Sequence, residues 1–244
     1  MLKNIIFEDE NMIAVYKPAG IATQTARIGQ RDMVSELKNY LAGKTEYKGK
    51  GEPYLGIVHR LDQPVSGIIV FAKTKLAAAE LTRQITTGQM QKYYYAVICG
   101  TSTAPWGRLE NYIYKDVKTN RSLIVAEGFP DAKIAILDYK LIKTLMVLGE
   151  AEFLSQEVSL MEIKLITGRH HQIRAQMSHA DMPLLGDSKY GSPESKDLSQ
   201  EAGCRNVALC AYKLVLNHPL TKKKITFEKQ PDGEIFIPFF TKGI

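Results

Sequence analysis

The sequence predicts an α+β protein built on a largely antiparallel sheet, with helices inserted between the strands. Two kinds of pattern carry this prediction. Short apolar stretches bounded by turn residues recur along the chain and are typical of strands. Three longer segments, residues 32–41, 76–87 and 167–180, instead place apolar side chains at helical spacing. The predicted strands outnumber these helices, and polar turns join several of them as antiparallel neighbours.

The N-terminal half is predicted to begin with a hairpin of two strands around a polar turn. Two helices and two further strands follow, and Gly88 stands directly after the second helix as a C-terminal cap. In chain order these segments are strands 5–7 and 12–16, helix 32–41, strand 68–72, helix 76–87 and strand 92–99.

Residues 101–157 are predicted to form short strands and turns, clearest at 122–126 and 132–142. The rest of the chain is predicted to contain a half-buried strand with alternating apolar and charged residues, then a helix and two last strands. These segments are strand 160–165, helix 167–180, and strands 208–216 and 224–228. No repeat, low-complexity tract or linker interrupts the pattern, so we expect residues 1–244 to form a single domain.

The composition favours a soluble cytoplasmic protein. No apolar run among the 244 residues approaches the roughly 20 needed to cross a bilayer, and the acidic N-terminus does not resemble a signal peptide. Three cysteines without a CxxC pair indicate neither a disulfide framework nor a zinc site. The net charge of +6 is compatible with a polyanionic partner. Local basic clusters comprise Lys44, Lys48 and Lys50; Lys115, Lys118 and Arg121; and Lys222, Lys223 and Lys224. Each is expected to lie on a solvated loop, and together they could follow the phosphates of a nucleic acid.

The segment His59-Arg60-Leu61-Asp62 is the first candidate site. Pro64 favours extended geometry before it, and the apolar run 68–72 that follows has the length of a buried strand. In an extended segment, Arg60 and Asp62 point to the same side. The sequence therefore predicts a carboxylate and a guanidinium displayed together beside a core strand.

A second candidate site, residues 168–174, is expected on the first turns of helix 167–180. Arg174 borders the apolar face centred near Ile173, with His170 one turn before it. An arginine beside buried surface usually has an anionic partner, and Asp62 is a candidate. The alternative is a surface arginine that extends its charge into solvent.

The three histidines of this region, His170, His171 and His179, do not predict a metal site. His170 and His179 would lie on opposite sides of the helix, and no pair is spaced four residues apart. The loop that follows, residues 182–191, is expected to be a structured turn. On strand 92–99, Tyr94 shares a face with Ala96 and Ile98, and its phenol is suited either to core packing or to stacking on a base.

Four blocks of this sequence, in order, resemble the RluA family of RNA pseudouridine synthases. They are Val15-Tyr16-Lys17-Pro18-Ala19-Gly20; His59-Arg60-Leu61-Asp62 with Ser66-Gly67 and Ala72-Lys73-Thr74; Lys92-Tyr93-Tyr94; and Thr167-Gly168-Arg169 with His171-Gln172-Ile173-Arg174, Pro183-Leu184-Leu185-Gly186-Asp187 and Tyr190-Gly191. The resemblance spans nearly the whole chain. It departs from the family pattern at Val65, His170 and Gln24-Thr25, none of which replaces an expected catalytic group.

The resemblance implies the pseudouridine synthase fold with a central active-site cleft, and isomerisation of specific uridines in ribosomal or transfer RNA without cofactor or metal. It assigns Asp62 as the essential carboxylate, Tyr94 as the stacking partner of the uracil and Arg174 as the cation that holds Asp62 in place. Arg60 would fill the position vacated by the flipped uridine. The remaining contacts to RNA or base would come from His59, Leu61, Arg169, His171, Gln172 and Ile173.

The resemblance also implies a chain without the N-terminal S4 RNA-binding domain of many relatives, and we expect a monomer. Two other functions are compatible with the residues. One is a non-catalytic RNA-binding protein with the same fold, although such a protein has no need of a charged pair beneath a base. The other is an unrelated hydrolase that uses the histidines.

Overall fold

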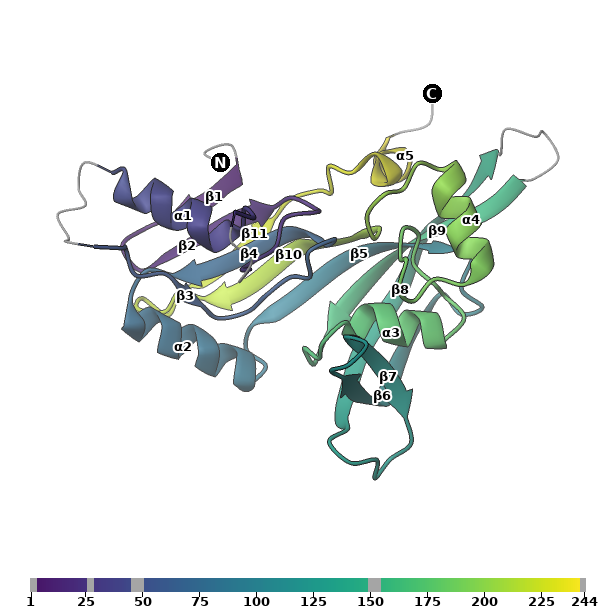
Figure 1. Ribbon diagram of the computed structural model, residues 1–244, viewed down its shortest axis with the longest axis horizontal. Coiled ribbons are helices and arrows are strands. Elements are labelled where there is room, and N and C mark those ends of the chain that lie inside the picture. The colour runs from purple at the N-terminus through teal and green to yellow at the C-terminus, as the bar shows by residue number, and fades with distance from the viewer. Residues whose placement is uncertain (1–3, 26–28, 45–50, 149–154, 242–244) are drawn as a thin grey trace. The chain divides into compact units, whose positions relative to one another are not determined.

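The computed structural model describes residues 4–25, 29–44, 51–148 and 155–241, and the chain divides into two compact units. Unit 1 comprises Met1–Gln91 and Ala211–Lys229, and unit 2 comprises Lys92–Cys210 and Gln230–Ile244. Each unit combines strands with helices (Figure 1), which confirms the predicted α+β class. The single catalytic domain with a central cleft stays a prediction. Among the described residues, no helix is long and apolar enough to span a membrane.

Within the described residues, unit 1 contains six strands and two helices. The strands hydrogen-bond in the order β1–β2–β4–β10, with β3 on β4 and β11 on β10. The bounds are β1 Ile5–Glu8, β2 Met12–Lys17, α1 Met33–Ala42, β3 Gly56–Ile57, β4 Ser66–Ala72, α2 Lys75–Thr86, β10 Leu209–Asn217 and β11 Lys224–Glu228.

The centre of unit 1 is the antiparallel pair β2 and β4, in which every residue is buried. Their register pairs Met12 with Ala72 and Lys17 with Gly67, so the residues just before β4 lie next to the end of β2. Gly67 has φ +125°, and a Cβ atom at this position would lie 2.4 Å from the main-chain N and O of Ala211. Only glycine fits this contact between β4 and β10.

Unit 2 is built on five strands that hydrogen-bond in the order β5–β9–β8–β6–β7. Helix α3 packs against β6 and β7 (Figure 1), and α4 and α5 are additional short helices that the sequence patterns did not predict. The bounds are β5 Gln91–Cys99, β6 Trp106–Asp116, β7 Arg121–Val125, β8 Lys133–Leu148, β9 Ser155–Leu165, α3 Gln172–His179, α4 Pro193–Glu201, a 3₁₀ turn at Glu234–Phe236 and α5 Ile237–Phe240.

The antiparallel register of unit 2 defines which residues share a face of its sheet. Lys92 lies opposite Leu165 and Tyr94 opposite Ile163, while Leu165 pairs with Leu137 on β8. The same face continues through Ala135 to Asn111 on β6, whose side chain accepts a hydrogen bond from Gln176 of α3. Directly paired residues of antiparallel strands point to the same side, so α3 covers the face that carries Tyr94.

Most predicted elements are confirmed within one or two residues, with three exceptions. Strand 160–165 is the C-terminal part of β9, which begins five residues earlier at Ser155. Residues 101–157 hold the long strands β6 and β8 instead of short ones. Helix 167–180 begins only at Gln172, because His171 adopts a left-handed backbone with φ +47° that ends any helix on its N-terminal side. The prediction that residues 168–171 form helical turns is therefore wrong, and His170 and His179 are not placed by a common helix.

Candidate active site

In unit 1, the segment that carries Asp62 is a loop whose main chain is hydrogen-bonded at Leu61. The Thr23 hydroxyl donates to the main-chain O of Leu61 at 2.9 Å and accepts from its N–H at 3.2 Å. Leu61 is buried, whereas Arg60 is exposed and Asp62 half-buried. This alternation agrees with the prediction that Arg60 and Asp62 point to the same side. The Asp62 carbonyl then accepts from Val65 N–H and closes a turn into β4.

A buried lysine supports the same loop. Lys17 is 0% exposed, and its ammonium group donates to the carbonyl oxygens of Pro18, Ile21 and Gln63 at 2.7–3.1 Å. Gln63 is the residue directly after Asp62, and its carbonyl also accepts from Gly20 N–H. Three carbonyls give this buried cation the partners that its desolvation requires. The block that begins at Val15 is thus a support for the carboxylate loop.

In unit 2, Tyr94 and α3 lie on one face of the sheet. The Tyr94 side chain is buried beside Ile163, the residue opposite it on β9. Ile173 and Arg174 are buried in the first turn of α3. Within this unit, Tyr94 therefore lies on the face of the sheet that α3 covers, and α3 carries Ile173 and Arg174.

Arg174 has an anionic partner, as predicted from its position beside buried surface. Its Nε and Nη2 donate to the two carboxylate oxygens of Asp187, each at 2.7 Å. The side chains are 4% and 1% exposed, which excludes the alternative of a solvated surface arginine. The Asp187 carboxylate also accepts hydrogen bonds from the main-chain N–H groups of Lys189 and Tyr190, so both of its oxygens are hydrogen-bonded. Asp62 as a further partner of Arg174 stays a prediction.

The side chains of Tyr190 and His171 pack beside this ion pair. The Tyr190 ring lies 5.1 Å from the Arg174 guanidinium, and its hydroxyl accepts from Ser122 N–H at 2.7 Å. The same hydroxyl lies 2.8 Å from Nδ1 of His171. Burial, helped by the positive charge of Arg174, lowers the pKa of His171 to about 3, so its imidazole is neutral at physiological pH. A hydrogen bond without a formal charge on the imidazole therefore joins Tyr190 to His171.

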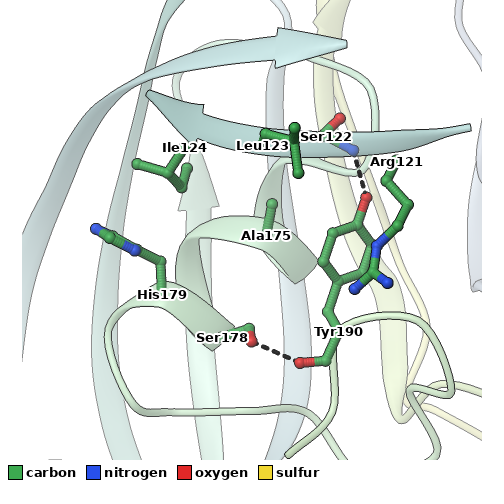
Figure 2. A pocket seen from close by; sticks show the side chains of 8 residues that line it. All are labelled: Arg121, Ser122, Leu123, Ile124, Ala175, Ser178, His179 and Tyr190. Carbon is green, nitrogen blue, oxygen red and sulfur yellow. Dashed lines mark hydrogen bonds between the residues drawn. The ribbon is translucent and has the colours of Figure 1, made fainter. Parts of the chain in front are cut away.

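A cavity of about 230 Å³ lies on the β7 side of α3 (Figure 2). Its lining residues come from β7, α3 and the loop before α4, and they are Arg121, Ser122, Leu123, Ile124, Ala175, Ser178, His179 and Tyr190. Figure 2 shows the Ser178 hydroxyl donating to the carbonyl of Tyr190, which joins α3 to that loop. The cavity borders the Tyr190 ring but contains none of the predicted site residues.

Several residues predicted to contact RNA have structural partners. His59 Nε2 accepts from Val70 N–H of β4. The Gln172 side chain accepts from Arg169 N–H and from the Thr167 hydroxyl, and donates to the Ile136 carbonyl. These contacts fix the loop before α3 and the loop before Asp62. RNA contacts by these residues, as by Leu61, Arg169 and His171, stay predictions.

The basic clusters differ in their environment. Lys44 is paired with Glu8, and Lys48 and Lys50 lie outside the described residues. Lys115 and Lys118 are exposed near the turn between β6 and β7, whereas Arg121 donates to the Lys189 carbonyl. In the described part of the chain, no group of three or more His, Cys, Asp or Glu side chains is arranged to hold a metal ion.

Sequence reasoning missed Asp187, Tyr190 and Ser122 as parts of this site. Asp187 lies 13 residues beyond Arg174. Asp187 and Tyr190 belong to the last block of the family resemblance, but neither was assigned a role, and their loop was interpreted as a structured turn. A further signal was chemical, because a guanidinium beside buried surface needs an acid and Asp187 stands in a Gly-Asp turn. Ser122 carried no signal because its partners, Tyr190 and His170, lie 68 and 48 residues away in the chain.

The family model described as RNA pseudouridylate synthase matches residues 11–179. This span is more than half of the chain and contains every predicted site residue. The chain therefore belongs to the RNA pseudouridylate synthase family, and the resemblance recognised in the sequence is confirmed.

Named relatives agree with this assignment. The chain is 34% identical to the uncharacterized RNA pseudouridine synthase YhcT of Bacillus subtilis, over 92% of this chain and 67% of that protein. It is 33% identical to the ribosomal large subunit pseudouridine synthase D of Zymomonas mobilis, over 96% and 71%. It is 29% identical to the tRNA pseudouridine synthase C of Pectobacterium carotovorum, over 98% of this chain and 63% of the relative. The chain thus spans about two thirds of the length of these relatives.

A solved structure has the same fold. Human RNA pseudouridylate synthase domain containing 1 superposes with a TM-score of 0.72 at 21% identity, over 93% of this chain and 83% of that one. At this level of identity the likeness concerns the fold alone, and it confirms the predicted pseudouridine synthase fold.

Proposed function

We propose that this chain is an RNA pseudouridine synthase that isomerises specific uridines in structured ribosomal or transfer RNA. The observation that carries the proposal is the family match over residues 11–179, which includes Asp62, Tyr94 and Arg174. The named relatives act on ribosomal RNA in one case and transfer RNA in another, so both remain candidate substrates here.

The reaction is an isomerisation in which the C1′–N1 bond of uridine breaks, the uracil turns and a C5–C1′ bond forms. C5 loses its proton and N1 gains one, so nothing is added or removed overall. We assign Asp62 as the essential carboxylate, consistent with a half-buried side chain on a loop fixed by Thr23 and Lys17. A rigid support of this kind limits the conformations of a reacting group and lowers the entropic part of the barrier.

Tyr94 and Arg174 have complementary roles in this proposal. Tyr94 stacks on the uracil and accepts or relays the proton that leaves C5. Arg174 keeps Asp62 ionised and oriented, and the bidentate pair with Asp187 fixes the direction of the guanidinium group. Ile173, next to Arg174 in α3, is suited to line the base pocket.

Arg60 has a separate role in this proposal, because a uridine inside folded RNA must leave its stack before it can react. Flipping costs a few kcal/mol of unstacking and unpairing. The exposed side chain of Arg60, two residues from Asp62, is suited to occupy the vacated position.

The test is carbodiimide mapping of pseudouridine in total RNA from cells that lack this protein, before and after addition of the purified chain. We expect a site that appears with wild-type protein and not with Asp62→Asn, whose turnover should fall by roughly 10²–10⁴-fold or more. RNA binding that persists in both proteins without any new site would favour the non-catalytic alternative.

A second variant separates flipping from chemistry. Arg60→Ala should slow turnover on folded RNA by roughly tenfold or more, because unstacking is no longer compensated. The same uridine in an unstructured oligonucleotide needs no flipping from a helix and serves as the matched control. An equal loss on both RNAs would contradict the role assigned to Arg60.

A further inference from the structure

Lys92 lies on the same face of unit 2 as Tyr94, two residues earlier on β5. Both pair with β9, Lys92 with Leu165 and Tyr94 with Ile163. At about 3.3 Å per residue, their Cα atoms are roughly 6.6 Å apart. The Lys92 ammonium group reaches the loop before α3, where a Cβ atom on Gly168 would lie 3.3 Å from Nζ. Lys92 is therefore adjacent to the proposed uracil-binding tyrosine and to the loop that leads to Arg174.

The ammonium group of Lys92 lacks the compensation that other buried cations of this chain have. Lys17 donates to three carbonyls, and Arg174 is paired with Asp187. Within the described part of the chain, no acceptor or carboxylate engages Lys92, although its side chain is half-buried. Burial alone accounts for a lowered pKa of this lysine. A cation in this situation is costly to the fold and is suited to an anion that arrives with the substrate.

We propose that Lys92 binds a phosphodiester group of the RNA next to the uridine that stacks on Tyr94. The inference rests on the proposed function, since it takes RNA as the ligand. Phosphate is the anionic group of RNA, and an ammonium group binds it as a compact point charge with three donors.

The experiment compares Lys92→Met with Lys92→Arg and with a matched loss of one charge, Lys196→Met. Lys196 is exposed on α4 of the same unit. Each substitution is placed in the Asp62→Asn background, so that binding is measured without turnover. The probe is a labelled transcript that carries the uridine modified by wild-type protein, and its affinity is measured from low to high salt.

For Lys92→Met we expect binding weakened by about tenfold at low salt. The slope of log K against log[salt] should become shallower by about 0.7–1, the loss of one phosphate contact. Lys92→Arg should restore most of that slope, and Lys196→Met should leave it unchanged. Because Lys92→Met removes an uncompensated, half-buried charge, the thermal midpoint of this variant should equal or exceed that of the parent protein.

Three results would overturn the inference. An unchanged salt slope in Lys92→Met would mean that no phosphate is bound there. A lowered thermal midpoint would mean that Lys92 serves the fold. Unaltered binding with a slower rate, measured with Asp62 intact, would assign Lys92 to the chemical step instead. Failure of the wild-type protein to form any pseudouridine would instead overturn the proposed function, and this inference with it.

Discussion

The ion pair between Arg174 and Asp187 offers a direct test of what holds the candidate site together. Both side chains are almost fully buried, and the carboxylate accepts two hydrogen bonds from Arg174 and two from the main chain. Asp187→Ala removes the carboxylate that accepts both of these hydrogen bonds from the buried guanidinium group. Removing one partner of such a pair costs about 3–5 kcal/mol.

The chain contains its own control for this prediction. Arg108 and Asp138 form an ion pair of the same residue types, also with two contacts, at 2.7 and 3.2 Å. Its side chains are 58% and 36% exposed, so solvent screens the charges. Asp138→Ala should therefore cost only about 0–1 kcal/mol. The two substitutions differ in burial and in the two main-chain hydrogen bonds that the Asp187 carboxylate accepts in addition.

The assay is equilibrium urea unfolding followed by far-UV circular dichroism, with thermal midpoints as a second measurement. For a chain of this size each kcal/mol lowers the midpoint by about 2–4 °C. Asp187→Ala should thus lower it by roughly 6–20 °C, and Asp138→Ala by only a few degrees. In a double-mutant cycle, Arg174→Ala with Asp187→Ala should cost less than the sum of the single variants. Equal losses for Asp187→Ala and Asp138→Ala would refute the argument from burial.

Two further predictions concern the backbone of unit 1 and the titration of unit 2. Gly67→Ala should destabilise the protein by at least about 1–3 kcal/mol, because the new Cβ atom would clash with the main chain of Ala211. The control is Gly88→Ala, at φ +70° with nothing within 4 Å of the new Cβ atom, which should cost only about 1 kcal/mol. Equal losses of soluble yield and urea midpoint in the two variants would contradict this prediction. The folded-state pKa of His171, about 3, lies below its ordinary value of 6.5, so stability should be full above pH 6.5 and decline as the pH falls toward 3. His171→Asn should flatten that decline in unfolding measured from pH 7.5 to 4.5, and parallel curves for both proteins would exclude the assignment.

Local patterns predicted most of the secondary structure because local physical chemistry dominates there. Asp32 and Thr74 stand before apolar residues at helical spacing, and their side chains cap α1 and α2 by accepting from Ser35 and Ala77. The continuous apolar run at residues 68–72 becomes the fully buried strand β4. The helix boundary before Arg174 was predicted wrongly, because no local pattern indicates the left-handed backbone of His171, whose imidazole pairs with Tyr190 19 residues further along the chain.

For the candidate site, too, part was predictable from the sequence and part depended on the tertiary structure. The sequence by itself determined the family, because its short blocks stand in a specific order and spacing, and the same blocks supply the residues that we propose for the chemistry. Only the tertiary structure decided how each is held: Asp187 as the partner of Arg174, Thr23 and Lys17 behind the Asp62 loop, and Lys92 on the face of Tyr94. These partners lie up to 46 residues apart in the chain. Pairing across such distances follows from strand register and buried charge, and neither is written in a local pattern.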